Sequence, residues 1–251
     1  MTRQRLKDLA SLTRRKGRAA LGQFVVEGVR SVEAAIVAGA PLVEVLVAQD
    51  VLGTPRIDEL VKAAPVPVHP VAARDLERIG DARTSQGVLA VAQSIVHHQL
   101  DGMGPVVVLD GVQDPGNVGA LVRSAAWFGV EAVVADARSA DFEGPKVVRA
   151  SMGGLWDLQL VRVPDLAPVL DACLVSRRVL WGADMHGTPV SSWRPSATDM
   201  LVLGNEGNGL SETVAAQVSG RVSIPGADSR RGVESLNVGV AAGVILHHWL
   251  G

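Results

Sequence analysis

Short apolar runs alternate with helical patterns through the second half of the chain, and this alternation restricts the fold more than any other feature. Residues 106–110 (VVVLD) are apolar up to their last position, as in a parallel strand that is covered on both faces. Further runs with strand character lie at 132–135, 158–163, 178–183, 200–203 and 221–224. Helical patterns lie between them at about 117–128, 144–152, 165–175 and 211–218, with a last one near 235–249. Strands that alternate with helices predict an α/β fold built on a doubly wound parallel sheet.

The first part of the chain repeats this alternation on a smaller scale. Apolar runs lie at 24–28, 43–49, 66–71 and 87–93, with helical patterns near 29–38, 56–64 and 72–79. This pattern predicts a separate, small αβ domain. Residues 94–104 (SIVHHQLDGMG) are polar, contain glycine and have no periodicity, which is typical of a linker. We therefore expect a domain at 1–96, a linker at 97–104 and a second domain at 105–251.

The composition is that of a soluble globular protein, with 47% hydrophobic and 20% charged residues and a formal net charge of −2. No run of 18 apolar residues occurs and the amino terminus lacks the apolar stretch of a secretory signal, so neither a membrane span nor secretion is expected. The single Cys173 cannot form an internal disulfide and suits a buried position in a reducing compartment. We expect a cytoplasmic protein. Because the first residues are rich in arginine, an organellar transit peptide is the alternative.

Basic residues are concentrated at the amino terminus. Residues 1–20 hold seven Lys and Arg against one acid, Asp8. A cluster of this kind can contact nucleic-acid phosphates. The candidates for such contacts are Arg14, Arg15, Lys16 and Arg18. The alternative is a helix face that only water covers.

Three turns with polar or glycine residues each follow a predicted strand, at 110–117, 204–211 and 225–237. In a parallel α/β sheet, ligands bind beyond the carboxyl ends of the strands. Although these turns are far apart in the sequence, the sheet would bring them to one edge. The sequence therefore predicts a ligand site there.

The first turn leads into a helix that carries one unexpected side chain. Asn117 is a suitable N-cap for this helix and Gly129 a suitable residue to end it. Arg123 lies on a different face from the apolar Leu121 and, because helical side chains lean toward the N-terminus, can reach back toward Asn117. The alternatives are plain capping for Asn117 and a surface ion pair for Arg123.

The second turn, GNEGNG (204–209), lets its backbone approach a ligand closely. Its glycine order is neither that of a dinucleotide-binding Rossmann loop nor that of a phosphate-binding P-loop. In the middle of the turn, Glu206 could accept hydrogen bonds from a ligand or orient Arg123. The alternative for Glu206 is a solvent-facing acid.

The third turn leads into a helix, 235–249, that is apolar almost all round and could pack against a second subunit as well as against its own sheet. Gly239 and Gly243 would permit a close backbone approach to a neighbour. Ser235 and Asn237, at the start of this helix, are either caps or polar groups that face the site. No group of residues has the spacing of a metal site, so no metal is expected.

Three motifs in the second domain resemble those of a known family. The motifs D-x-x-x-D-P-x-N-x-G-x-x-x-R (110–123), L-G-N-E-G-x-G-L (203–210) and I-P…E-S-L-N-V-x-V-A (224–241) occur in this order. Their order and content resemble the SpoU/TrmH family of RNA ribose methyltransferases, a branch of the SPOUT superfamily. Residues 1–93 resemble the substrate-binding domain that family members acting on ribosomal RNA carry in front of their methyltransferase domain.

The resemblance implies a trefoil knot, S-adenosylmethionine as the cofactor and an obligate homodimer that methylates a ribose 2′-hydroxyl, most often in ribosomal RNA. By motif position it implies that Arg123 activates the hydroxyl, as a phosphate clamp or as a base. The groups that would orient Arg123 and the ribose are Asn117, Glu206, Ser235 and Asn237. The residues that would hold the cofactor are Leu203, Gly204, Asn205, Gly207, Ile224 and Leu236.

Two features depart from the family pattern. The loop at 226–233 is about three residues longer than usual and adds Arg230 and Arg231, and Gly239 stands where members often have Ser. Three alternatives stay open: a catalytically silent RNA-binding or ribosome-assembly factor of the same fold, a transfer-RNA ribose methyltransferase, and a nucleotide-dependent oxidoreductase. A fragment that starts at residue 103 is expected to fold, dimerise and bind the cofactor while losing most of its RNA affinity.

Overall fold

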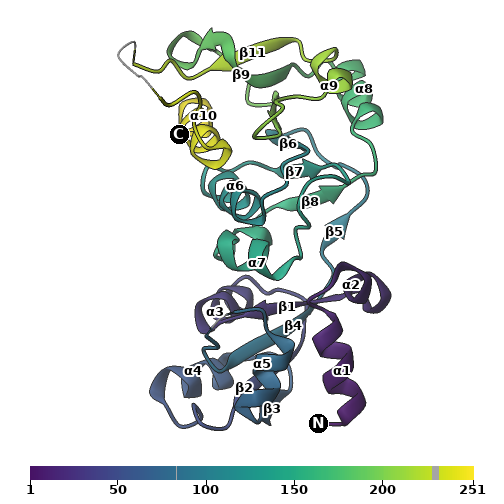
Figure 1. The fold of residues 1–251 in the computed structure, drawn as a ribbon, viewed down its shortest axis with the longest axis vertical. Helices are drawn as coiled ribbons and strands as arrows, with labels where there is room; N and C mark the ends of the chain where they lie inside the picture. The colour runs from purple at the N-terminus through teal and green to yellow at the C-terminus, as the bar shows by residue number, and fades with distance from the viewer. Residues whose placement is uncertain (83, 228–231) are drawn as a thin grey trace. The chain divides into compact units, whose positions relative to one another are not determined.

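The structure is a computed structural model that describes residues 1–82, 84–227 and 232–251 (Figure 1). It divides into two compact units, one of which consists of Met1–Ile95 and Asp141–Asp157. The other consists of Val96–Ala140 and Leu158–Gly251. The division after Ile95 falls close to the expected boundary. The segment Asp141–Asp157, however, was expected inside the second domain and packs with the first unit instead.

The first unit contains a four-stranded sheet in the order β1-β4-β2-β3. Its strands are β1 (Gln23–Glu27), β2 (Leu42–Ala48), β3 (Val68–Val71) and β4 (Val88–Gln93). The helices between them are α3 (Val29–Val37), α4 (Pro55–Ala63) and α5 (Ala73–Ile79). All seven elements lie where the periodicity predicts them. Two further helices, α1 (Arg3–Ser11) and α2 (Arg15–Leu21), precede β1 and were not predicted as elements. Leu9 and Leu12 anchor them in the core of this unit.

The segment Asp141–Asp157 completes the first unit. It contains α7 (Pro145–Ser151) and the 3-10 helix η1 (Gly154–Trp156). Its Phe142, Val147 and Val148 are buried. The Trp156 ring stacks on Phe24 of β1, with 5.8 Å between ring centroids. This segment is therefore part of the core of the first unit.

The second unit contains a seven-stranded sheet in the order β11-β9-β10-β6-β7-β8-β5, and all its strand pairs are parallel. The strands are β5 (Val96–His97), β6 (Val106–Asp110), β7 (Ala132–Ala135), β8 (Gln159–Arg162), β9 (Leu180–Pro189), β10 (Met200–Gly204) and β11 (Gly220–Ser223). Every residue of β6 and β7 is buried, as expected for strands covered on both faces. The expected α/β fold with a parallel sheet is confirmed.

The expected linker at 97–104 needs one correction. Val96 and His97 pair with Leu160 and Val161 as strand β5, so the connection starts inside the sheet. A two-residue strand is too short to produce a periodic signal in a polar sequence.

The helices of the second unit are α6 (Pro115–Trp127), α8 (Ala167–Val175), α9 (Glu212–Ala215) and α10 (Val238–Leu250), with the 3-10 helix η2 (Val190–Ser192). Helices α6 and α10 lie side by side (Figure 1). A Cβ added to Gly239 would lie 3.5 Å from the Cβ of Ala120, and one added to Gly243 would lie 4.0 Å from the Oγ of Ser124. Both distances are ordinary van der Waals contacts, so α10 does approach α6 here, but the approach does not require glycine at either position. Among the described residues, no helix is long and apolar enough to cross a membrane.

The expected N-cap of α6 was wrong. The cap is Asp114, whose Oδ1 accepts the backbone N–H of Asn117 at 2.9 Å. Pro115 occupies the first position of the helix, which a proline suits because it has no N–H to satisfy. The cap therefore lies three residues before Asn117, and the side chain of Asn117 is available for another contact. Gly129, with φ +73°, follows the end of the helix as predicted.

Candidate active site

A chain of side-chain hydrogen bonds joins the three predicted turns. Asn237, the N-cap of α10, donates from Nδ2 to Oδ1 of Asn117 at 2.9 Å. Asn117, in the first turn of α6, donates from Nδ2 to Oε1 of Glu206 at 2.8 Å. Glu206 lies in the loop after β10, beyond the carboxyl end of the strand. Three residues that are far apart in the sequence thus meet at one edge of the sheet, as the motifs predicted.

Arg123 and Ser235 do not join this chain. Arg123 is exposed on α6, and within the described parts of the chain it makes no hydrogen bond or ion pair. Its guanidinium is therefore available to an external anion. Ser235 is exposed just before α10 and is likewise without a hydrogen bond to any described residue.

Asn205 shapes the loop that carries Glu206. Its Oδ1 accepts the backbone N–H groups of Gly207 at 3.0 Å and Asn208 at 3.1 Å. Its Nδ2 donates to the carbonyl oxygen of Gly111 at 2.9 Å, and its backbone pairs with that of Gly209. All polar atoms of Asn205 are therefore engaged inside the protein. The side chain of Asn205, a residue expected to contact the cofactor, thus holds the loop in place.

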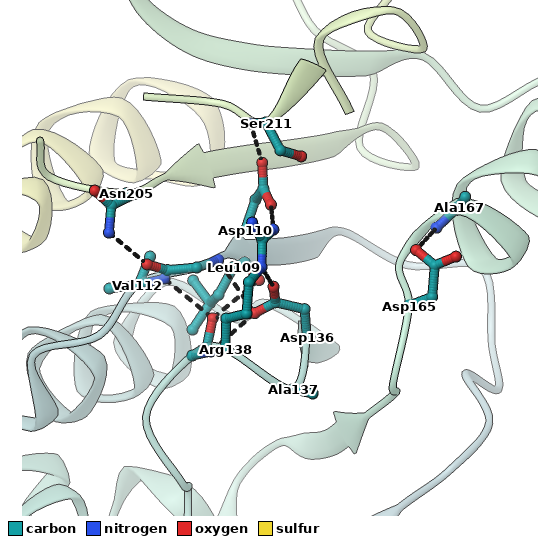
Figure 2. Close-up of polar contacts among 12 residues, drawn as sticks. Leu109, Asp110, Val112, Asp136, Ala137, Arg138, Asp165, Ala167, Asn205 and Ser211 are labelled. Carbon is teal, nitrogen blue, oxygen red and sulfur yellow. Dashed lines mark hydrogen bonds and ion pairs between the residues drawn. The ribbon is translucent and has the colours of Figure 1, made fainter. Parts of the chain in front are cut away.

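A buried carboxylate, Asp110, fastens the far end of the same loop (Figure 2). Asp110 is the last residue of β6 and its side chain is fully buried. Its Oδ2 accepts the backbone N–H of Ser211 at 2.6 Å, and its Oδ1 accepts a short hydrogen bond from Arg138. Asp110 is the first residue of the first motif, but the sequence alone predicts no role for it. An acid at the carboxyl end of an otherwise apolar strand was the available signal.

Arg138 also binds Asp136, through Nε at 2.6 Å. Burial raises the pKa of the Asp136 carboxyl, but hydrogen bonds from Ser139, Arg138 and Gly111 outweigh burial and hold the pKa below its usual value. The hydrogen bond to Asp136 raises the pKa of Arg138. Two buried carboxylates thus share the guanidinium of Arg138, whose side chain is 58% exposed.

The end of β10 has the features of a cofactor cradle. The pairing of β10 with β9 covers Met200–Val202, whereas its pairing with β6 continues to Gly204. Within the described residues, the β10 edge that faces β9 therefore has no strand partner from Leu203 onward. Unpaired peptide groups need hydrogen-bond partners and can bind the edge of a ligand ring. Ile224 and Leu236 provide apolar side chains that are only partly covered. These residues fit an adenosine-bearing cofactor such as S-adenosylmethionine.

The basic cluster at the amino terminus divides into two groups. Arg14, Arg15 and Lys16 are exposed and remain candidates for phosphate contacts. Arg18 is only 6% exposed; it donates to the carbonyl oxygen of Leu12 at 2.8 Å and pairs with Asp141 at 2.6 Å. The expected RNA contact of Arg18 is therefore wrong. The number of basic residues in a segment does not show which of them are exposed and which are buried in ion pairs.

Part of the long loop at 226–233, residues 228–231, lies outside the described residues. Arg230 and Arg231, which the sequence places near the site, lie outside the described residues.

Comparison with known proteins gives the family. Residues 104–247 match the model of the SpoU rRNA Methylase family, and residues 3–90 match that of the MRM3-like substrate binding domain. The chain belongs to the SpoU rRNA methylase family.

Several SpoU/TrmH proteins resemble the chain along its length. The 23S rRNA (guanosine(2553)-2′-O)-methyltransferase RlmP of Bacillus subtilis is 28% identical, covering 99% of this chain and 96% of that protein. The 23S rRNA (uridine(2479)-2′-O)-methyltransferase of Streptomyces viridochromogenes is 30% identical, covering 95% and 86%. The crystal structure of the SpoU methyltransferase AviRb from S. viridochromogenes with its cofactor AdoMet superposes with a TM-score of 0.85 at 30% identity, covering 98% and 97%.

As a SpoU methylase, the protein is an S-adenosylmethionine-dependent RNA 2′-O-methyltransferase. The family, the fold class and the cofactor expected from the three motifs are confirmed.

Proposed function

We propose that this SpoU methylase methylates a ribose 2′-hydroxyl of ribosomal RNA in the cytoplasm, and that its three motif turns form the reaction site. The observation that carries the proposal is the hydrogen-bond chain from Asn237 through Asn117 to Glu206, in the unit that also carries the exposed Arg123. The match of residues 3–90 to a substrate-binding domain and the ribosomal RNA substrates named for the relatives support the choice of RNA.

Arg123 is proposed to activate the attacking hydroxyl. When bound, S-adenosylmethionine supplies a methyl group on a positively charged sulfur, and transfer needs the ribose oxygen in line with that methyl as its proton leaves. Because an arginine guanidinium stays protonated at neutral pH, Arg123 acts best by binding a neighbouring phosphate and stabilising the developing alkoxide. Direct proton removal by Arg123 is the second possibility.

Asn117, Glu206 and Asn237 are proposed to orient the ribose and Arg123. Within the described residues, Oε2 of Glu206 has no hydrogen-bond donor and can accept one from the substrate. The donor sequence from Asn237 to Asn117 to Glu206 fixes which way both amides point. Ser235 is placed in this group by its motif position alone.

The cofactor is proposed to lie against Leu203, Gly204, Ile224 and Leu236, where peptide groups at the end of β10 are unpaired and apolar side chains are partly uncovered. Asn205 and Gly207 would contribute indirectly, because their hydrogen bond keeps the loop compact. The trefoil knot implied by the family is proposed for the segment that contains β9, β10, β11 and α10.

We further propose a homodimer that forms over the outer face of α6 and α10. Exposed apolar side chains gather on these two helices: Trp127 is 83% exposed, Val240 55% and Val244 40%. Leu236, just before α10, is also exposed. Water-exposed apolar side chains on adjacent helices are typical of an interface. Ala242, on the same helix, is fully buried within the single chain and is not available to a partner.

The test is incubation of the purified protein with labelled S-adenosylmethionine and separated ribosomal and transfer RNA, followed by mapping of the label. Label on one ribose of ribosomal RNA is expected. Label confined to transfer RNA would give the substrate of the alternative branch. Tight RNA binding without any label would identify a silent assembly factor.

A further inference from the structure

The loop that carries Glu206 is held at both ends by two consecutive residues of the first motif. At one end, Nδ2 of Asn205 donates to the carbonyl oxygen of Gly111. At the other end, the backbone N–H of Ser211 donates to Oδ2 of Asp110. The loop between these anchors contains Glu206, and among the described residues its one bridge joins Asn205 to Gly209 within the loop itself. The orientation of Glu206 toward Asn117 therefore depends on Asp110 and Asn205.

Asp110 can serve as an anchor because its buried carboxyl group has hydrogen-bond donors on both oxygens. A buried carboxylate without partners is strongly disfavoured, and each donor it accepts is worth more than in water. Its two donors are the Ser211 N–H and Arg138, and Arg138 is in turn fixed by Asp136 (Figure 2). Oδ1 of Asp136 accepts hydrogen bonds from the backbone N–H of Gly111 at 3.1 Å and from the hydroxyl of Ser139.

We propose that Asp110, together with Arg138, is a positioning residue for methyl transfer: the pair holds the loop after β10 in the place from which Glu206 contacts Asn117. Neither residue touches the reacting atoms. The inference rests on the proposed role of Glu206 and adds the group that determines where Glu206 lies.

The pair also predicts how the reaction depends on pH when Arg138 is lost. The charged groups that face Asp110 are Arg138 and, through it, Asp136; Asp165 lines the same cavity of about 220 Å³. Without Arg138, two buried carboxylates would lie close together with no cation between them. Loss of Arg138 removes one of the hydrogen bonds that hold the pKa of Asp136 low, so Asp136 would take up its proton at higher pH. A proton on Asp136 weakens its hydrogen bond from the N–H of Gly111, whose carbonyl oxygen anchors Asn205, and so loosens the loop.

The experiment compares the wild type with Arg138→Gln in single-turnover methylation of ribosomal RNA across pH 5.5–8.5. At neutral pH the rate of Arg138→Gln should be about ten-fold lower, because small misplacements of catalytic groups cost one to two orders of magnitude. The acid limb of its pH–rate profile should move to higher pH, and the KM for RNA should stay within about two-fold. In Asp110→Asn/Arg138→Gln the shift should shrink, since one carboxylate of the pair is gone.

Two further variants keep the test decisive. Asn205→Asp preserves the acceptors for Gly207 and Asn208 but removes the donor to Gly111, and should lower the rate similarly even if Arg138→Gln folds poorly. Asp165→Asn is the matched control, because Asp165 lies at the same edge but accepts only from the backbone of Ala167 (Figure 2).

The inference fails if Arg138→Gln and Asn205→Asp both methylate at the wild-type rate with an unshifted acid limb, or if Asp165→Asn gives the same loss. A wild-type protein that does not methylate ribosomal RNA would instead refute the proposed function.

Discussion

Arg123 is the one proposed catalytic group with a positive charge, and among the described residues it has no hydrogen-bond or ion-pair partner. We predict that Arg123→Ala lowers the rate of methyl transfer by about a hundred-fold or more, because a positioned activating group is lost. The affinity for S-adenosylmethionine should change little, since Arg123 acts on the hydroxyl. Single-turnover rates and calorimetric titration of the cofactor measure the two effects.

Arg123→Lys is the informative control. A lysine keeps the positive charge but loses the forked geometry that binds a phosphate through two nitrogens, so partial activity is expected. Near-normal turnover of Arg123→Ala would remove Arg123 from the mechanism.

The three exposed basic residues at the start of α2 make a second prediction at this scale. Changing Arg14, Arg15 and Lys16 together to Gln should weaken RNA binding and flatten its dependence on salt. If all three contact phosphate, the slope of log affinity against log salt should fall by about two to three. Binding titrations from low to high salt measure this. Arg18→Gln should instead lower the melting temperature, because it breaks the buried pair with Asp141.

The residues of the site were predictable where a motif marks a turn, and unpredictable where the partner is distant. Asn117, Glu206 and Asn237 were found because each follows a strand within a recognisable pattern. The role of Asp110 was not, because its partner Ser211 is 101 positions away and only the fold brings them together. Arg18 shows the opposite failure, since a basic cluster does not reveal which member points inward.

Among the elements, the outer face of α6 and α10 carries the prediction of a dimer. Val244→Glu places a charge among exposed apolar side chains and should give a monomer without loss of folding, because Val244 is 40% exposed in the single chain. Analytical ultracentrifugation at micromolar concentration measures the mass. Val175→Glu, at an exposed valine of α8 in the same unit, is the matched control and should stay dimeric. A wild-type monomer would contradict the dimer.

Continuous apolar runs were predicted well, and polar segments were not. The strands β6, β7 and β10 are continuous apolar runs and their limits agree with the structure within one residue. Strand β5 and helices α1 and α2 are polar and were not predicted from apolar periodicity. Helices α1 and α2 are held by the packing of a few side chains, such as Leu9 and Leu12, in the core of the first unit.

At the scale of the whole molecule, Asp141–Asp157 changes what a fragment can do. A fragment of residues 103–251 carries this segment without residues 1–95, against which it packs. Phe142, Val147, Val148 and Leu155 would then be exposed, each at a cost of about 1.5–3 kcal/mol. We therefore now predict that this fragment aggregates or melts well below the full chain, as differential scanning calorimetry would measure. A soluble fragment with a normal melting temperature would contradict this.

The same segment sets an order of events during synthesis. Domains usually fold in turn as they leave the ribosome, the first one first. Here the first unit lacks part of its core until residue 157 has been made, by which time β5, β6 and β7 of the second unit are already present in the nascent chain. The amino-terminal unit is thus begun first but completed only after synthesis of the second unit has started, and until then the surface of β1 that α7 covers stays exposed.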